Sequence, residues 1–195
     1  MIKNTRIDSG QGFDWVDDLY ITNYREFGGL PLKSITRLTK DDAYALAKSL
    51  SQKSTSKRDR YGDYFDTYYP RRLRTEEWLY NTFISLNGRP QTCHPLYFVL
   101  HESAGLCDYY GHEDKKQILL QDIDTFHISF TPRDSMHLTD MGLTENVVWR
   151  KETLYELIKE SGKSIPEFLA SISEKYGGRY IEVQLWSDVY IEQFK

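Results

Sequence analysis

Short segments in which apolar and polar residues alternate predict several strands. Residues 126–131 alternate in this way, and residues 96–102, 117–121 and 179–186 share the same period of two. Successive side chains of a strand point to opposite faces of a sheet, so this period indicates strands with one apolar face. Residues 15–22, 147–151 and 189–194 are weaker strand candidates, and Ser187-Asp188 is the turn expected before the last.

Apolar residues at helical spacing predict helices between these strands. Residues 40–52 form the first, with Thr39 as its N-cap. Residues 61–86 are also helical in pattern, but we expect a break at Pro70, with proline in the first turn of a new helix. Gly88 is the expected C′ residue of that helix.

Two further helices are predicted near the end of the chain. Residues 152–161 form one of them, and the tetrad Ser164-Ile165-Pro166-Glu167 is a capping box that opens the next. Gly177 and Gly178 close it.

The order of these elements predicts an α+β fold. Helices and strands are segregated along the chain, which favours an antiparallel or mixed sheet of about five strands packed against helices. The length of 195 residues suits one domain over residues 1–195. Glycines and irregular patterning make residues 1–34 a hairpin or a loosely attached N-terminal segment.

Composition narrows the classes of function. Lys plus Arg number 25 against 29 Asp plus Glu, giving a net charge of -4. A general DNA binder is usually strongly basic, so this class is disfavoured, although a local basic groove is not. Aromatic residues reach 14%, with 15 tyrosines, the residue that most often presents a stackable edge at interfaces.

The same sequence predicts a cytoplasmic protein without a membrane partner. The first six residues lack the apolar region of a signal peptide. Apolar runs stay well below the roughly 18 residues that a membrane span needs. The two cysteines, Cys93 and Cys107, are too few for a disulfide scaffold.

Three of the predicted strands share a polar face if they belong to one sheet. Splitting residues 96–101, 126–131 and 180–186 by alternation leaves one face rich in polar and aromatic groups. Its members are His101, His127, Ser129, Thr131, Glu182, Gln184, Tyr97, Tyr180 and Trp186.

This face has the groups that acid–base chemistry needs. His127 or His101 together with Glu182 is the expected catalytic pair, because a histidine and a carboxylate exchange protons near neutral pH. Ser129, Thr131 and Gln184 are expected to bind substrate. Tyr97, Tyr180 and Trp186 would stack an unpaired base. The alternative is the ordinary solvated face of an antiparallel sheet.

Arginines near Pro70 are the predicted phosphate clamp. Arg71, Arg72 and Arg74 fall in the expected first turn of a helix, where cations are disfavoured, so a bound anion would explain them. Arg72 could instead pair with Glu76, four residues later. Arg133, at a strand exit, is a further candidate.

Two loops receive structural interpretations. Arg133, Asp134 and Ser135 could line the mouth of a pocket. We favour the alternative interpretation, in which Asp134 and Ser135 form an Asx-type turn. The loop cations Lys57, Arg58 and Arg60 are expected to be solvated.

No metal or cofactor is expected. Cys93-His94, and Cys107 with His112, lack the C-x₂₋₄-C spacing of zinc fingers and ribbons. Adjacent cysteine and histidine side chains also diverge, which argues against a zinc site and a Cys93 nucleophile.

Three hypotheses of function remain open. The first is an enzyme acting on RNA or a nucleotide by metal-independent acid–base chemistry, as an endoribonuclease does. The second is an NAD-using ADP-ribosyltransferase, with His127, Tyr97 or Tyr180, and Glu182 in analogous roles. The third is a non-catalytic inhibitor that covers a protein or nucleoprotein partner, such as a phage anti-defence (anti-CRISPR type) protein, through a tyrosine-rich surface. Convergence of His127 and Glu182 would favour catalysis, and an exposed tyrosine patch elsewhere would favour binding.

Overall fold

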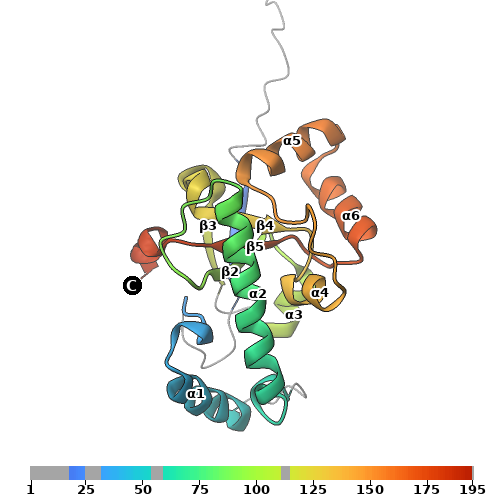
Figure 1. Ribbon diagram of the computed structural model, residues 1–195. Coiled ribbons are helices and arrows are strands. Elements are labelled where there is room, and N and C mark those ends of the chain that lie inside the picture. The colour runs from blue at the N-terminus through green and yellow to red at the C-terminus, as the bar shows by residue number, and fades with distance from the viewer. Residues whose placement is uncertain (1–17, 25–31, 54–58, 111–114, 195) are drawn as a thin grey trace, which may run out of the picture.

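Five strands form one antiparallel sheet in the order β3-β1-β2-β5-β4. A computed structural model describes residues 18–24, 32–53, 59–110 and 115–194 (Figure 1). The strands are β1 (Tyr20–Tyr24), β2 (Leu96–Leu100), β3 (Lys115–Leu119), β4 (Ile128–Thr131) and β5 (Glu182–Leu185). The predicted α+β fold with an antiparallel sheet is therefore confirmed. Some predictions concern residues outside the described ranges. These are the N-terminal part of the 15–22 strand, most of the 1–34 segment, Lys57, Arg58 and His112.

The apolar face of the sheet is covered by two helices, α5 (Lys151–Ser161) and α6 (Ile165–Tyr176). Leu154 and Ile158 of α5 and Phe168 of α6 pack in one cluster with the apolar side chains of all five strands. Ser164 forms the predicted capping box with Glu167, and Gly177 ends α6 in the left-handed conformation. The hydrophobic core lies between this helix pair and the sheet.

Helix α2 (Phe65–Ser85) crosses the opposite face of the sheet, in front of β2 and β5 in Figure 1. Its buried side chains are Phe65, Tyr69, Arg72, Thr75, Glu76, Leu79 and Phe83. Leu79 and Phe83 pack on Trp186, which lies just after β5. Phe65 and Tyr69 pack instead on α1 (Lys40–Lys53), through Ala43 and Ala47.

The predicted break at Pro70 is wrong. Helix α2 continues through Pro70, which is its sixth residue. Proline here removes one backbone hydrogen bond. Because Tyr69 packs before it and Leu79 after it in separate hydrophobic clusters, packing holds both halves of the helix in line.

The end of α2 also differs from the prediction. Asn87, with φ 64°, takes the left-handed position that was expected for Gly88. Gly88 is needed for another reason, because a Cβ there would lie 2.5 Å from the ring of Phe83. The glycine permits close approach of the ring rather than an unusual backbone angle.

The predicted strand at 189–194 is a 3-10 helix, η6 (Asp188–Phe194). Both edges of β5 are already occupied, by β2 and by β4. A strand following β5 through a tight turn would therefore have no free neighbour in the sheet, so the chain turns away.

The sequence pattern did not predict two short helices, α3 (Ala104–Tyr110) and α4 (Ser135–Asp140). The strand candidate at 147–151 is reduced to one bridge between Phe130 and Trp149. Within the described ranges, no helix has the length and apolar character to cross a membrane.

Candidate functional site

The predicted polar face exists, but it is buried. In the observed register Gln184 lies between Ser129 on β4 and Tyr97 on β2, and Thr131 faces Glu182. Helix α2 covers these side chains, so the hypothesis of an ordinary solvated face is wrong. Because buried polar groups need partners, this face must form a connected network.

In one part of the network, side chains of β4 and β5 and of the following Trp186 form hydrogen bonds with one another. Ser129 donates to Gln184 Oε1 over 2.9 Å, and Gln184 Nε2 donates to Thr131 Oγ1 over 3.1 Å. Trp186 Nε1 donates to Ser129 Oγ over 2.9 Å. These four side chains are completely buried, so they join β4 to β5 and to Trp186 and present no surface for a substrate. Their predicted substrate-binding role finds no support in this geometry.

Glu182 is the acidic centre of the polar face. Its side chain accepts hydrogen bonds from the hydroxyl and backbone N–H of Ser135 on α4, and from Gln184 Nε2 over 3.1 Å. Burial raises the pKa of Glu182 to about 7, with a further contribution from the negative charge of Asp134, while Arg72 acts in the opposite direction. A carboxyl group of this kind both donates and accepts protons near neutral pH.

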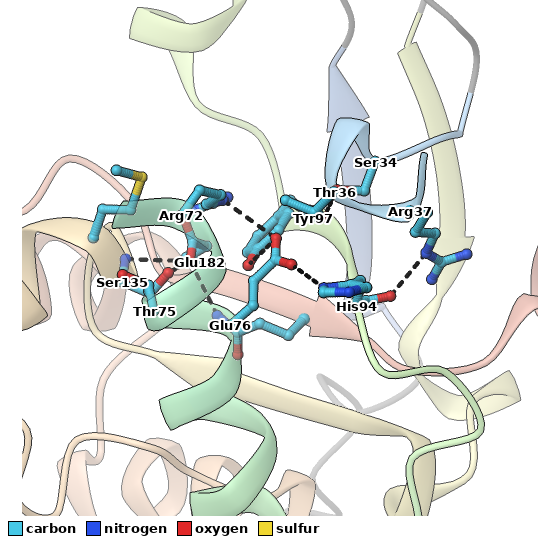
Figure 2. A network of polar contacts seen from close by, with 12 residues as sticks. Ser34, Thr36, Arg37, Arg72, Thr75, Glu76, His94, Tyr97, Ser135 and Glu182 are labelled. Carbon is cyan, nitrogen blue, oxygen red and sulfur yellow. Dashed lines mark hydrogen bonds and ion pairs between the residues drawn. The ribbon is translucent and has the colours of Figure 1, made fainter. Parts of the chain in front are cut away.

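A second buried carboxylate, Glu76, lies on α2 and reaches the other side of the network (Figure 2). Tyr97 donates to Glu76 Oε1 over 3.1 Å, and His94 Nδ1 lies 2.6 Å from Oε2. Arg72 Nε lies 3.5 Å from Oε1, and the guanidinium covers the Tyr97 ring at 3.6 Å. The expected Arg72–Glu76 pairing is therefore present, as part of a larger network.

A cavity of about 590 Å³ opens beside Glu182. Its tyrosine and arginine lining consists of Tyr24, Tyr68, Tyr97, Tyr109, Tyr110, Tyr180, Arg60, Arg72, Arg133 and Arg179. Glu182, Asp134 and His137 complete its ionisable groups. Pockets of this size hold nucleotide-sized ligands, and this one offers rings for stacking and cations for phosphate.

Arg60 is held among tyrosines rather than solvated, which corrects the expectation for this loop. Its Nη2 donates to the Tyr109 hydroxyl over 2.9 Å, and its Nη1 to that of Tyr110 over 3.4 Å. The guanidinium also lies 5.6 Å from the Tyr68 ring centroid. The tyrosines around it raise its pKa despite burial, so Arg60 stays charged.

The two predicted catalytic histidines lie outside the cavity. If the β4–β5 register is continued, His127 lies opposite Trp186. Thr131, the partner of Glu182, is four residues away, a distance of about 13 Å along a strand. Its Nδ1 contacts the Tyr190 hydroxyl at 2.7 Å. His101 follows β2 with φ 57° and packs on the Tyr20 ring, and burial lowers its pKa. The structure does not bring either histidine to Glu182.

The three arginines of the predicted phosphate clamp do not lie together at one site. Arg71, Arg72 and Arg74 lie in the interior of α2, because the helix begins at Phe65, so the proposed anion site at a helix N-terminus is wrong. Arg71 pairs with Asp140 of α4, and Arg74 is exposed. Only Arg72 among these three lines the cavity.

Arg133, a candidate for the phosphate clamp, lies at the cavity wall. Its Nη1 donates to the Tyr176 carbonyl over 2.8 Å, and its buried Nε has no hydrogen-bond partner among the described atoms. A Cβ on Gly178 would lie 2.6 Å from the Cβ of Arg133, so that glycine allows the loop after α6 to pack on it. Asp134 forms the predicted turn and caps α4 by accepting from the N–H groups of Met136 and His137. Tyr180 donates to Asp134 Oδ2 over 3.4 Å.

The cysteines do not form a metal site with described residues. Cys93 is exposed, and the Cys107 thiol donates to the Tyr24 hydroxyl over 3.3 Å. Over the ranges the structure describes, no three His, Cys, Asp or Glu side chains gather as metal ligands would.

Comparison with known proteins gives no relative from which residues could be transferred. No family model, curated protein or solved structure matches the chain. The cavity and its residues are therefore the observations from which a function can be proposed.

Several site residues were missed from the sequence, among them the cavity-lining Tyr68 and Arg179. His137 follows Asp134 by three residues, and alternation along strands could not place it because it lies on a short helix. Glu76 was considered only as an ion-pair partner of Arg72. Arg60 stands next to Tyr61 in the sequence, and that tyrosine-rich context was the available signal.

Proposed function

We propose that this protein is an enzyme that cleaves RNA, or a nucleotide phosphodiester, by metal-independent acid–base chemistry centred on Glu182. One observation carries the proposal. A buried carboxyl group with a pKa of about 7 lies at the wall of a nucleotide-sized cavity lined by tyrosines and arginines. Perturbed acids in such cavities are favoured candidates for catalytic residues.

The proposed reaction is an internal transphosphorylation. Glu182 as carboxylate takes the proton of a ribose 2′-hydroxyl, and the 2′-oxygen forms a bond to phosphorus. The bond from phosphorus to the 5′-oxygen breaks, and that oxygen receives a proton from an acid. His137 lines the same cavity and replaces His127 and His101 as the proposed acid. The products are a 2′,3′-cyclic phosphate and a free 5′-hydroxyl.

The remaining lining residues have roles that suit this reaction. Arg72 and Arg133 would hold the phosphate oxygens as charge develops on them. The rings of Tyr68 and Tyr180 would stack on a base, since every base has a flat aromatic face.

The test is cleavage of a labelled single-stranded RNA in EDTA. Glu182→Gln is expected to lower the rate by about 100-fold or more, and His137→Gln by a similar factor. Glu156→Gln is the matched control, because Glu156 is an exposed carboxylate on α5, which covers the opposite face of the sheet. It should cleave at the wild-type rate.

His127→Gln decides between the two histidine assignments. Unchanged cleavage is expected, because His127 contacts Tyr190 outside the cavity. A loss that matched Glu182→Gln would return the acid to His127. Label transfer from NAD without RNA cleavage would support the ADP-ribosyltransferase hypothesis instead. Absence of both activities would favour the inhibitor hypothesis.

A further inference from the structure

A second, smaller cavity of about 170 Å³ adjoins the one beside Glu182. The two cavities share part of their lining, namely Tyr24, Arg60, Tyr68, Arg72, Tyr97 and Tyr110. Beyond this shared wall the small cavity is enclosed by other residues. Leu46 and Leu50 of α1 and Leu96 of β2 supply apolar surface, and Asn23 and Ser34 supply polar groups.

The shared wall holds Arg60 and Arg72, the two arginines that line both cavities. Arg133 and Arg179 line the large cavity alone, and Lys33 lines the small one alone. Arg60 is surrounded by tyrosine rings and hydroxyls, and it takes part in none of the ion pairs found among the described residues. Arg72 has Glu76 as its ion-pair partner at 3.5 Å, but both oxygens of that carboxylate also contact other groups, His94 and Tyr97. The wall therefore carries more positive than negative charge, an arrangement that favours a bound anion.

We infer that the two cavities are adjacent base subsites and that the site binds a dinucleotide step of RNA, with its bridging phosphate between Arg60 and Arg72. This inference depends on the proposed function and names its substrate more closely. Apolar walls beside a few polar groups, as in the small cavity, suit a flat base that is recognised at its edge. The large cavity accepts the neighbouring nucleoside.

This arrangement places the reacting phosphate next to the acid–base residue. Arg72 lines both cavities, and Glu182 lines the large cavity with it. A phosphate at Arg72 is therefore near the carboxyl group that takes the 2′-hydroxyl proton. Cleavage would separate the two nucleosides, one in each cavity.

The experiment measures binding of two probes by calorimetry. One is a uridine–adenosine dinucleotide whose first sugar lacks the 2′-hydroxyl, so that it cannot be cleaved, and the other is uridine 3′-monophosphate. We expect the dinucleotide to bind about tenfold more tightly or better. Leu46→Trp fills the small cavity and should abolish this advantage while leaving monophosphate binding unchanged.

Ala45→Trp is the matched control, because Ala45 is exposed on the same helix and does not line the cavity. It should preserve the preference for the dinucleotide. Arg60→Gln should weaken binding of both probes and leave binding of uridine, which has no phosphate, unchanged.

Three outcomes would overturn the inference. They are equal binding of the two probes by the wild-type protein, an unaltered preference in Leu46→Trp, or tighter binding of NAD than of the RNA dinucleotide. If Glu182→Gln still abolished RNA cleavage, the first two outcomes would leave the proposed function standing. Failure of both probes to bind, without RNA cleavage, would reject both proposals.

Discussion

Glu182 is easier to protonate in the folded protein than in the unfolded chain. Its pKa rises from 4.5 to about 7, mainly because burial penalises the charged form. The folded state therefore holds an extra proton between these pH values. The stability that this proton contributes is fully present below pH 4.5 and is lost as the pH rises toward 7.

Glu182→Gln should remove this pH dependence. The amide oxygen of glutamine can still accept the hydrogen bonds from Ser135 and Gln184, but it does not ionise. We expect the variant to match the wild type near pH 4.5 and to exceed it by on the order of 2–3 kcal/mol at pH 8. Urea denaturation across this range measures it, with Glu156→Gln as control. Parallel pH curves for wild type and variant would contradict the expectation.

The carboxylate of Glu76 stabilises the fold, in contrast to that of Glu182. Its loss would leave the Arg72 guanidinium and the Tyr97 hydroxyl without their partner. Glu76→Ala should lower the free energy of unfolding by about 3 kcal/mol, since Arg72 would remain buried without its carboxylate. Glu76→Gln keeps the acceptor for Tyr97 and should cost clearly less. Denaturant titration of both variants measures the difference. Equal losses would mean that shape, rather than charge and hydrogen bonding, holds this part of the network.

At the level of elements, the end of α2 depends on contact with an aromatic ring. Gly88→Ala should destabilise the protein by about 1–3 kcal/mol, because the new Cβ would meet the Phe83 ring. Gly105→Ala is the matched control, since it lies within α3 with no atom within 4 Å of the added Cβ. It should be neutral or stabilising by up to about 1 kcal/mol. Thermal unfolding compares them, and equal effects would contradict the steric explanation.

The sequence predicted elements well where periodicity and caps agree. Helices α1, α5 and α6 lie close to their expected positions, and the Ser164 capping box fixed the start of α6. Period-two alternation placed β4 and β5 on a common polar face. These are local signals, and local physics determines them.

The sequence could not show what covers that face. Alternation separates two faces of a strand, but it does not tell whether water or α2 lies over the polar one. The partners of Glu182 and Arg60 come from segments distant in the chain, Ser135 and Tyr109, through helices too short to show a pattern. The cavity is therefore a product of tertiary packing.

At the level of the whole molecule, Arg37 ties three distant segments together. It donates from Nε to the His94 carbonyl over 2.8 Å, from Nη2 to Thr92 over 3.2 Å, and its Nη1 pairs with Asp188 at 2.6 Å. Arg37 lies in the 3-10 helix Ile35–Arg37, and Asp188 begins η6.

Arg37→Ala should loosen η6 without unfolding the protein. We expect amide hydrogen exchange in residues 188–194 to accelerate by about tenfold, because one half-buried ion pair is lost, while α5 and α6 keep their protection. Exchange monitored by mass spectrometry measures it. Uniform acceleration throughout the chain would show that Arg37 stabilises the whole fold instead.

The position of β5 in the sheet has a consequence for synthesis. β5 pairs with β2 and β4, so the last of the described strands takes an interior position in the sheet rather than an edge. While a ribosome is making residues 132–181, β2 has one open edge and β4 lacks its partner in the sheet. Such edges recruit other chains. The nascent protein should therefore depend on chaperones until β5 emerges, and stalled products that end before Glu182 should aggregate.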